Sequence, residues 1–241
     1  MSSALAVSLV VCCLALLCAQ TPAFEVATIK ENPGPVRIGH WPNLRNGTFL
    51  SSNITLKRVL GVAFGVTEVR IIGPDWLDSA YFDFMAKSPK GVPDSALQPM
   101  LQALLQDRFK LQFHREARET IVYYLVVAKG GLKMKPYPAR ERPRDDPNFR
   151  GFPAGGGRMT VSLLADMLAR AVSRPVIDKT GLSGEYEFSL HWATPADNLP
   201  EFAPPDIFTA VQEQLGLKFD PGKDNLEVIV IDHMERMPTD N

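Results

Sequence analysis

Histidine is the residue type in this chain best suited to acid–base or metal chemistry. The four histidines are His40, His114, His191 and His233. They form neither an HExxH pair nor another close spacing of metal ligands, so no zinc site is indicated. In the run His114-Arg115-Glu116 a histidine and a carboxylate could share general acid–base work. An exposed hairpin end explains this run, and the run 233–235, without catalysis, and we expect that explanation to hold.

Three aspartates, Asp75, Asp78 and Asp83, cluster around Trp76 and could be imagined as calcium ligands. Calcium loops need oxygen ligands at short, regular intervals, usually with a glycine at the sharp turn. Here the aspartates instead alternate with aromatic and aliphatic residues. We therefore expect turn-forming aspartates beside buried aromatic side chains.

Neither a nucleophile elbow nor a phosphate loop is indicated. No serine lies in a GxSxG context, which disfavours a hydrolase of that type. Gly155-Gly156-Gly157 opens onto an expected strand and not onto a helix with a lysine, so it is interpreted as a hinge. The sequence therefore predicts no catalytic residue, cofactor or metal.

Residues 1–23 are typical of an export signal. The run from Ala4 to Cys18 spans 15 residues, all apolar except Ser8, which suits a signal peptide and is short for a helix crossing roughly 30 Å of hydrocarbon. Cleavage is expected near residue 19 or 23, and either site removes all three cysteines. The mature protein is then periplasmic or extracellular without membrane insertion; the alternative is a retained N-terminal anchor.

The charges divide the chain into three parts. With 26 Lys+Arg against 27 Asp+Glu the whole is nearly neutral, which disfavours a strongly basic nucleic-acid binder. Residues 24–128 carry a net charge of +2, residues 129–158 carry +5 and residues 159–241 carry −8. The middle part holds five prolines and six glycines, so we interpret it as a linker between two α+β units.

The linker is the candidate interaction site. It is either a solvated basic loop or a segment that docks on the acidic second unit or on an anionic partner. Aromatic side chains outside any periodic pattern are candidate contact points. The candidate interaction residues are Arg140, Arg142, Arg144, Phe149 and Phe152.

The two units look like copies of one pattern, β-α-β-β-α-β-β. Each begins with a strand and an amphipathic helix. The expected core stripe of the first helix is Leu56, Val59, Leu60 and Phe64, and that of the second is Leu163, Leu164, Met167, Leu168 and Val172. The alternating strands 81–84 and 186–190 follow, and then the helices 95–107 and 206–215.

Each unit is predicted to close with a β-hairpin. In the first, FKLQFHRE and IVYYLVVA flank a polar turn; in the second, GLKFD and LEVIVID flank the turn signal Pro221–Asn225. The stretch 24–29 lies outside the repeat and is expected to add an edge strand. Each unit is expected to hold its own modest core.

Two family resemblances follow from these segments. The second half, with MTVSLLADMLARAVSRPVID, FTAVQEQLGLKF and VIVID, resembles the short N-terminal domain of secretins and TonB-dependent receptors, a periplasmic protein-interaction module. Nearly the whole mature chain resembles a soil-associated family of uncharacterised secreted bacterial proteins, a domain of unknown function. The segments that carry this second resemblance are FEVATIKEN, IIGPDWLDSAYFDFMAK, MLQALLQDRFKLQFHRE, YYLVVAKGGLKMK, RPVIDKTGLSGEYEF, VQEQLGLKF and VIVIDHMERMPTDN.

The resemblances imply an exported, non-enzymatic protein that binds an envelope protein or peptide. Similar domains occur fused to membrane-embedded metallopeptidase sensors, so a sensing role is a further reading. Strand addition at an exposed sheet edge is the binding mode we expect for such small sheets. The alternative is an extracytoplasmic hydrolase with an unrecognised site.

Overall fold

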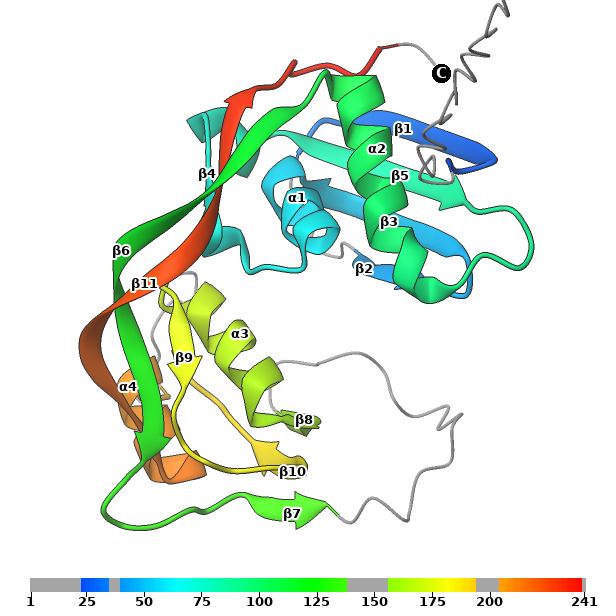
Figure 1. Ribbon diagram of the computed structural model, residues 1–241. Helices are drawn as coiled ribbons and strands as arrows, with labels where there is room; N and C mark the ends of the chain where they lie inside the picture. Colours follow the sequence, from blue (N-terminus) through cyan, green and yellow to red (C-terminus); the bar gives the residue numbers. More distant parts are fainter. Residues whose placement is uncertain (1–22, 35–39, 138–155, 194–203, 240–241) are drawn as a thin grey trace, which may run out of the picture.

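Two lobes joined by one long two-stranded ribbon make up the protein (Figure 1). This computed structural model describes residues 23–34, 40–137, 156–193 and 204–239. Helices and strands are mixed along the described chain, which confirms the α+β class expected from the sequence.

The N-terminal lobe is a four-stranded sheet of order β1-β5-β3-β2, with α1 and α2 on one face (Figure 1). Its strands are β1 (Val26–Asn32), β2 (His40–Arg45), β3 (Thr48–Thr55) and β5 (Tyr81–Lys87), its helices α1 (Leu56–Phe64) and α2 (Leu97–Phe109), and its one-turn helices η1 (Glu68–Arg70), η2 (Asp75–Asp78) and η3 (Asp94–Ala96). All four residues of the core stripe expected on α1 are buried. The edge strand expected near residues 24–29 is confirmed as β1.

Of the three aspartates near Trp76, Asp75 and Asp78 form a turn as expected, whereas Asp83 lies in β5. Asp75 and Asp78 begin and end η2, and Asp78 accepts a hydrogen bond from Lys57 at 2.7 Å. Asp83 accepts the backbone N–H of Asn53 at 2.7 Å, which holds the irregular part of β3 against β5.

The C-terminal lobe contains a three-stranded sheet of order β7-β10-β8. Its elements are β7 (Lys135–Tyr137), β8 (Gly156–Thr160), α3 (Val161–Ala171), β9 (Val176–Asp178), β10 (Glu185–Ser189), α4 (Ile207–Ala210) and the wide helical turn η5 (Val211–Leu215). Thr160 caps α3, because its hydroxyl accepts the N–H of Leu163 at 3.3 Å.

Two sequence predictions for this lobe are wrong. Leu163 is 55% exposed, because the buried face of α3 is formed by Leu164 and Leu168 on the other side. Gly156 and Gly157, interpreted as a hinge, lie in β8 and pair with β10, because β10 offers them a strand partner.

The ribbon consists of β6 (Gln112–Val127) and β11 (Leu217–His233), which pair antiparallel along almost their whole length. Each strand runs from one lobe into the other (Figure 1). The short β4 (Ile71–Ile72) extends the ribbon parallel to β11, and β9 extends it parallel to β6, giving the order β4-β11-β6-β9.

The two hairpins predicted from the sequence are therefore wrong. The segment expected to turn in the first half is part of β6, and the turn signal Pro221–Asn225 lies inside β11, opposite residues 119–123 of β6. Each strand finds its partner in the other half of the chain. The polar residues in the middle of both strands are explained by exposure between the lobes and not by chain reversal.

Pro221 and Gly222 have other roles in β11. Proline lacks a donor and is tolerated where the ladder is open on one side; β11 pairs with β4 only further along, at Ile229 and Val230. A Cβ on Gly222 would lie 2.3 Å from the ring of Tyr124, so the glycine makes room for this ring across the ladder. The Tyr124 hydroxyl then donates to the carbonyl of Lys223 at 2.7 Å.

Each of the two hydrophobic cores draws on both halves of the chain. The core beneath α1 and α2 includes Ile229, Ile231 and Met234, from β11 and the residue after it. The core beneath α3 and η5 includes Leu125, from β6. The end of each ribbon strand thus completes the lobe encoded by the other half.

A charged contact also joins the lobes. Glu68, on η1 of the N-terminal lobe, has one carboxylate oxygen 3.3 Å from Nε of Arg58 and the other 2.8 Å from Nε of Arg170 on α3. Burial lowers the pKa of Arg58 and raises that of Asp166, which lies near the same contact. Partly buried ion pairs of this kind fix an orientation more reliably than they add stability.

We expect the two halves not to fold separately. A fragment of residues 24–128 loses Ile229, Ile231 and Met234 from its core, and each fully buried side chain of this size contributes about 1.5–3 kcal/mol. Three such losses approach the whole stability of a typical domain, about 5–15 kcal/mol. Thermal unfolding followed by circular dichroism should show no cooperative transition for residues 24–128 or 129–241 alone.

The chain of residues 24–241 is the control and should unfold cooperatively, and mixing the two fragments should restore the transition. A monomeric 24–128 fragment that unfolds cooperatively would show that the first half closes its own hairpin, and would contradict the exchange of strands.

Candidate functional site

The candidate interaction residues of the linker, Arg140, Arg142, Arg144, Phe149 and Phe152, lie outside the described residues. Their role stays a prediction. The described residues include two other candidate sites, the titratable cluster around His114 and the uncovered face and edge of the N-terminal sheet.

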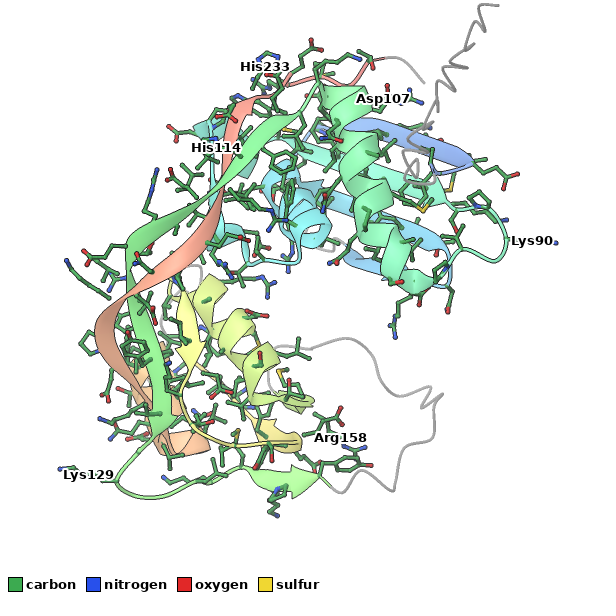
Figure 2. All side chains as sticks on the ribbon, in the orientation of Figure 1. Lys90, Asp107, His114, Lys129, Arg158 and His233 are labelled. Carbon is green, nitrogen blue, oxygen red and sulfur yellow. The ribbon has the colours of Figure 1, made fainter. Side chains whose placement is uncertain are left out.

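His114 lies near the end of the ribbon that reaches the N-terminal lobe (Figure 2). Its Nδ1 is 2.8 Å and 3.0 Å from the two carboxylate oxygens of Asp232, one strand away on β11. Its Nε2 is 3.8 Å from Glu116, which also forms an ion pair with Arg118. The hydrogen bond to Asp232 is the largest of the effects that raise the pKa of His114. The histidine is therefore stabilised as an imidazolium between two carboxylates.

His114 makes the hydrogen bonds expected of an acid–base residue, but it does not lie in a pocket that excludes water. The side chain of His114 is 49% exposed, and that of Asp232 is 45% exposed. Catalytic pairs work in pockets that exclude water and hold a substrate against them, whereas these residues lie on an open strand face. The cluster is sufficiently explained as an ion-pair network that fastens the end of β6 to β11.

Among the histidines whose side chains the structure describes, His191 and His233 form no hydrogen bond or ion pair with this cluster. His233 ends β11 opposite Gln112, and Nε2 of His191 is 3.1 Å from the Ser189 hydroxyl in the C-terminal lobe. Within the described ranges, no three His, Cys, Asp or Glu residues are grouped so that they could hold a metal ion. In the same part of the chain, no helix has the length and apolar character needed to cross a bilayer.

The N-terminal sheet has one covered and one open face. Alternate residues of β5 point to opposite faces, and Phe82, Phe84 and Ala86 are buried beneath the helices. On the open face Met85 is 53% exposed and lies directly opposite Leu50 of β3, which is 54% exposed.

The open apolar surface continues to the edge strand. Met85 faces Thr28 of β1 on its other side, and Val26 of β1, paired with Lys87, is 51% exposed. Three of the exposed large hydrophobic side chains of the described chain therefore lie on neighbouring strands of one sheet. An apolar surface of this kind can contact another protein.

Sequence reasoning missed this surface although a signal was present. Met85 and Leu50 occupy the solvent-facing positions of alternating strands, where polar residues are usual. The pattern YFDFMAK shows this for Met85, since Phe82, Phe84 and Ala86 define the other face. Only the sheet register shows that Leu50 is its neighbour.

A titration tests the His114 cluster. We expect the pKa of His114 to lie above its ordinary value of 6.5, and Asp232→Asn to lower it. Because the folded state binds the proton more tightly, the contact stabilises fully below the unfolded pKa, and this stability is lost as the pH rises through the folded pKa.

The difference in melting temperature between wild type and Asp232→Asn should therefore be largest at pH 5 and vanish well above the folded pKa. NMR titration of the His114 imidazole signals in the two proteins provides the pKa values. An unchanged His114 titration in Asp232→Asn would show that the pair does not form in solution.

Comparison with known proteins identifies a family without an assigned activity. No curated protein and no solved structure matches the chain. Residues 57–234 match the family described as Protein of unknown function (DUF3738). This confirms the expected domain of unknown function, whereas the likeness to secretin and TonB-dependent receptor domains stays a prediction. Because the match covers well over half of the 241 residues, the chain belongs to the DUF3738 family.

Proposed function

We propose that this protein is an exported, non-enzymatic module that binds an extended segment of an envelope protein by strand addition along β1. The observation that carries the proposal is the free edge of β1. All seven residues of this strand pair with β5 in regular register, from Val26 opposite Lys87 to Asn32 opposite Tyr81. No described strand pairs with the other side of β1.

The other described edges are less suited to strand addition. β4, β7 and β9 have only two or three residues, and β8 has five, two fewer than β1. β2 has an irregular register with β3. The ribbon edges carry Pro221 and many charged residues, which are features that natural sheets use to prevent pairing with another chain. β1 contains neither a proline nor a bulge.

Side chains next to β1 could add contact area for the bound segment. A strand beside β1 would place alternate side chains on the open face of the sheet, next to Val26 and one strand from Met85. Backbone hydrogen bonds along the edge would supply affinity, and the apolar surface would favour partners with apolar residues at every second position.

The partner is proposed to be outside the cytoplasm because the first 23 residues resemble a signal peptide. No observation favours the alternative hydrolase, because the hydrogen bonds of His114 are those of an ion-pair network at the end of the ribbon.

We also propose that the two halves are copies of one unit with exchanged closing strands. The order β3-α1-β4-β5-α2-β6 repeats as β8-α3-β9-β10-α4-β11. Ile71 of β4 pairs with Ile229 of β11, and Val176 of β9 pairs with Tyr123 of β6, so each short strand joins the long strand of the other copy. A 1:1 complex of residues 24–128 and 129–241 after mixing is the expected result.

Proline substitutions test strand addition. Successive amides of a β-strand point to opposite sides, so of Ala27→Pro and Thr28→Pro one removes a donor toward β5 and the other removes a donor at the free edge. The variant that keeps the wild-type melting temperature identifies the free-edge position. We expect this variant to lose the envelope partner that the tagged wild-type protein captures, as identified by mass spectrometry.

Leu163→Ser, which removes an exposed apolar side chain from α3 in the other lobe, is the control and should still capture the partner. Hydrogen exchange of the wild-type complex provides a second measurement, which needs no variant. Unchanged exchange of the β1 amides on binding would contradict the proposal, as would capture of the same partner by the free-edge variant.

A further inference from the structure

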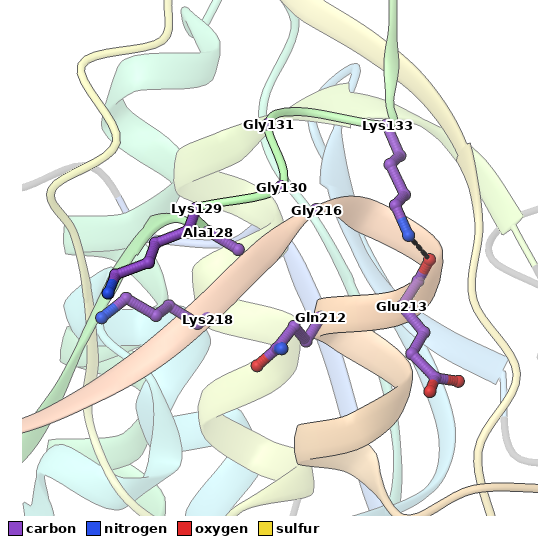
Figure 3. A pocket seen from close by; sticks show the side chains of 9 residues that line it. All are labelled: Ala128, Lys129, Gly130, Gly131, Lys133, Gln212, Glu213, Gly216 and Lys218. Atoms are coloured by element: carbon purple, nitrogen blue, oxygen red, sulfur yellow. Dashed lines mark hydrogen bonds between the residues drawn. The ribbon is translucent and has the colours of Figure 1, made fainter.

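A pocket lies where the ribbon enters the C-terminal lobe (Figure 3), whereas β1 lies in the N-terminal lobe (Figure 1). It is formed by the turn after β6, by Gln212 and Glu213 of η5, and by the start of β11. Its lining residues are Ala128, Lys129, Gly130, Gly131, Lys133, Gln212, Glu213, Gly216 and Lys218. The volume is about 290 Å³, at the lower end of the roughly 300–1,000 Å³ typical of small-molecule sites.

Positive charge predominates in this pocket. Three of the lining residues are lysines and one is a glutamate. Lys133 donates to the backbone carbonyl of Glu213 at 2.6 Å, so its charge compensates the carbonyl end of the helix. The carboxylate of Glu213 points away from Lys129 and Lys218 in Figure 3.

Lys129 and Lys218 are the two cations available to a ligand. Both line the pocket, and Figure 3 shows their side chains extending in the same direction. Lys218 forms an ion pair with Asp220 at 2.6 Å, whereas Lys129 has no charged or hydrogen-bonding partner among the described residues. Asp220 offsets the charge of Lys218, so the ammonium group of Lys129 leaves an unbalanced positive charge in the pocket, which an anion would neutralise.

One side of the pocket is formed by the backbone of three glycines, Gly130, Gly131 and Gly216, which have no side chains. Gly216 has a φ of +70°, and a Cβ there would lie 2.0 Å from the carbonyl oxygen of Gly131, so only glycine fits. Ala128 accepts the N–H of Gly131 at 2.9 Å, which closes the turn. The N–H of Gly130 in the middle of this turn donates to no described backbone acceptor and could serve a ligand oxygen. The lysine stems and Ala128 supply apolar contact for a short carbon skeleton.

We propose that this pocket binds a small organic anion, whose carboxylate or phosphate group lies between Lys129 and Lys218. The size of the pocket suits a compact metabolite and excludes a folded partner. The site does not depend on strand addition at β1, because the two lie in different lobes. The sequence placed Lys129 in the linker and Lys218 in a strand of the second unit, and only pairing of β6 with β11 brings the two together.

NMR titration of the 15N-labelled chain of residues 24–241 tests the proposal. The probes are succinate, inorganic phosphate and the neutral analogue succinamide, each added to about 10 mM at low ionic strength, since affinities near millimolar are expected for a single small anion. We expect saturable shifts of the Gly130, Gly131 and Gly216 amides with at least one anion and none with succinamide. The anion that saturates distinguishes a carboxylate site from a phosphate site.

Lysine variants locate the site. Lys129→Met and Lys218→Met should each weaken binding about tenfold, because each removes one charge-assisted hydrogen bond. Lys90→Met, which removes an exposed lysine of the N-terminal lobe (Figure 2), is the matched control and should bind as wild type. Raising the salt concentration should reverse the shifts in the wild-type protein, a measurement that needs no variant.

Three outcomes would overturn the proposal. These are equal shifts with succinamide and succinate, unsaturable shifts with both anions, and binding that Lys129→Met and Lys218→Met leave unchanged. Loss of binding in Lys90→Met to the same extent would indicate non-specific attraction to lysine and would also contradict a defined site.

Discussion

Backbone hydrogen bonding between β6 and β11 is the interaction on which both lobes depend. The ladder runs from Leu217 opposite Val127 to His233 opposite Gln112, so its two ends lie in different cores. Each end supplies apolar side chains that the local half of the chain lacks, such as Ile229 beneath α1 and Leu125 beneath α3. The lobes are therefore linked by shared cores as well as by covalent connection, and local unfolding of the ribbon would expose both.

The same ladder explains where the polar features lie. In its middle both strands are exposed, and the charged residues there protect open edges from pairing with another chain. At one end His114 joins Asp232 across the strands, and at the other the turn after β6 brings Lys129 to the start of β11. Open edges remain elsewhere, and β1 is the longest one with regular pairing and no protective proline.

The sequence predicts the helices and strands of the fold better than it predicts the candidate sites. The helix at Leu56–Phe64 follows from apolar spacing, and its stripe is buried as expected. The α3 stripe was only partly right, because Leu163 is apolar yet faces solvent. The lysine pocket could not be predicted, since Lys129 and Lys218 are far apart in the sequence and meet only through the register of two strands. The glycine after the helix, Gly216, was the available local signal.

By itself the sequence determined the elements: periodicity, caps and turn residues act over a few neighbours, and they placed most helices and strands of the α+β fold correctly. The tertiary structure alone decided the partners of the strands. Pro221 and Gly222 indicate a hairpin locally, but β11 continues through them because β6 offers an uninterrupted ladder and Tyr124 fills the space above the glycine. Several distant segments have similar local patterns, so the local sequence does not specify which strands pair. The pairing of β6 with β11 is favoured because it buries Ile229 and Leu125 in opposite lobes.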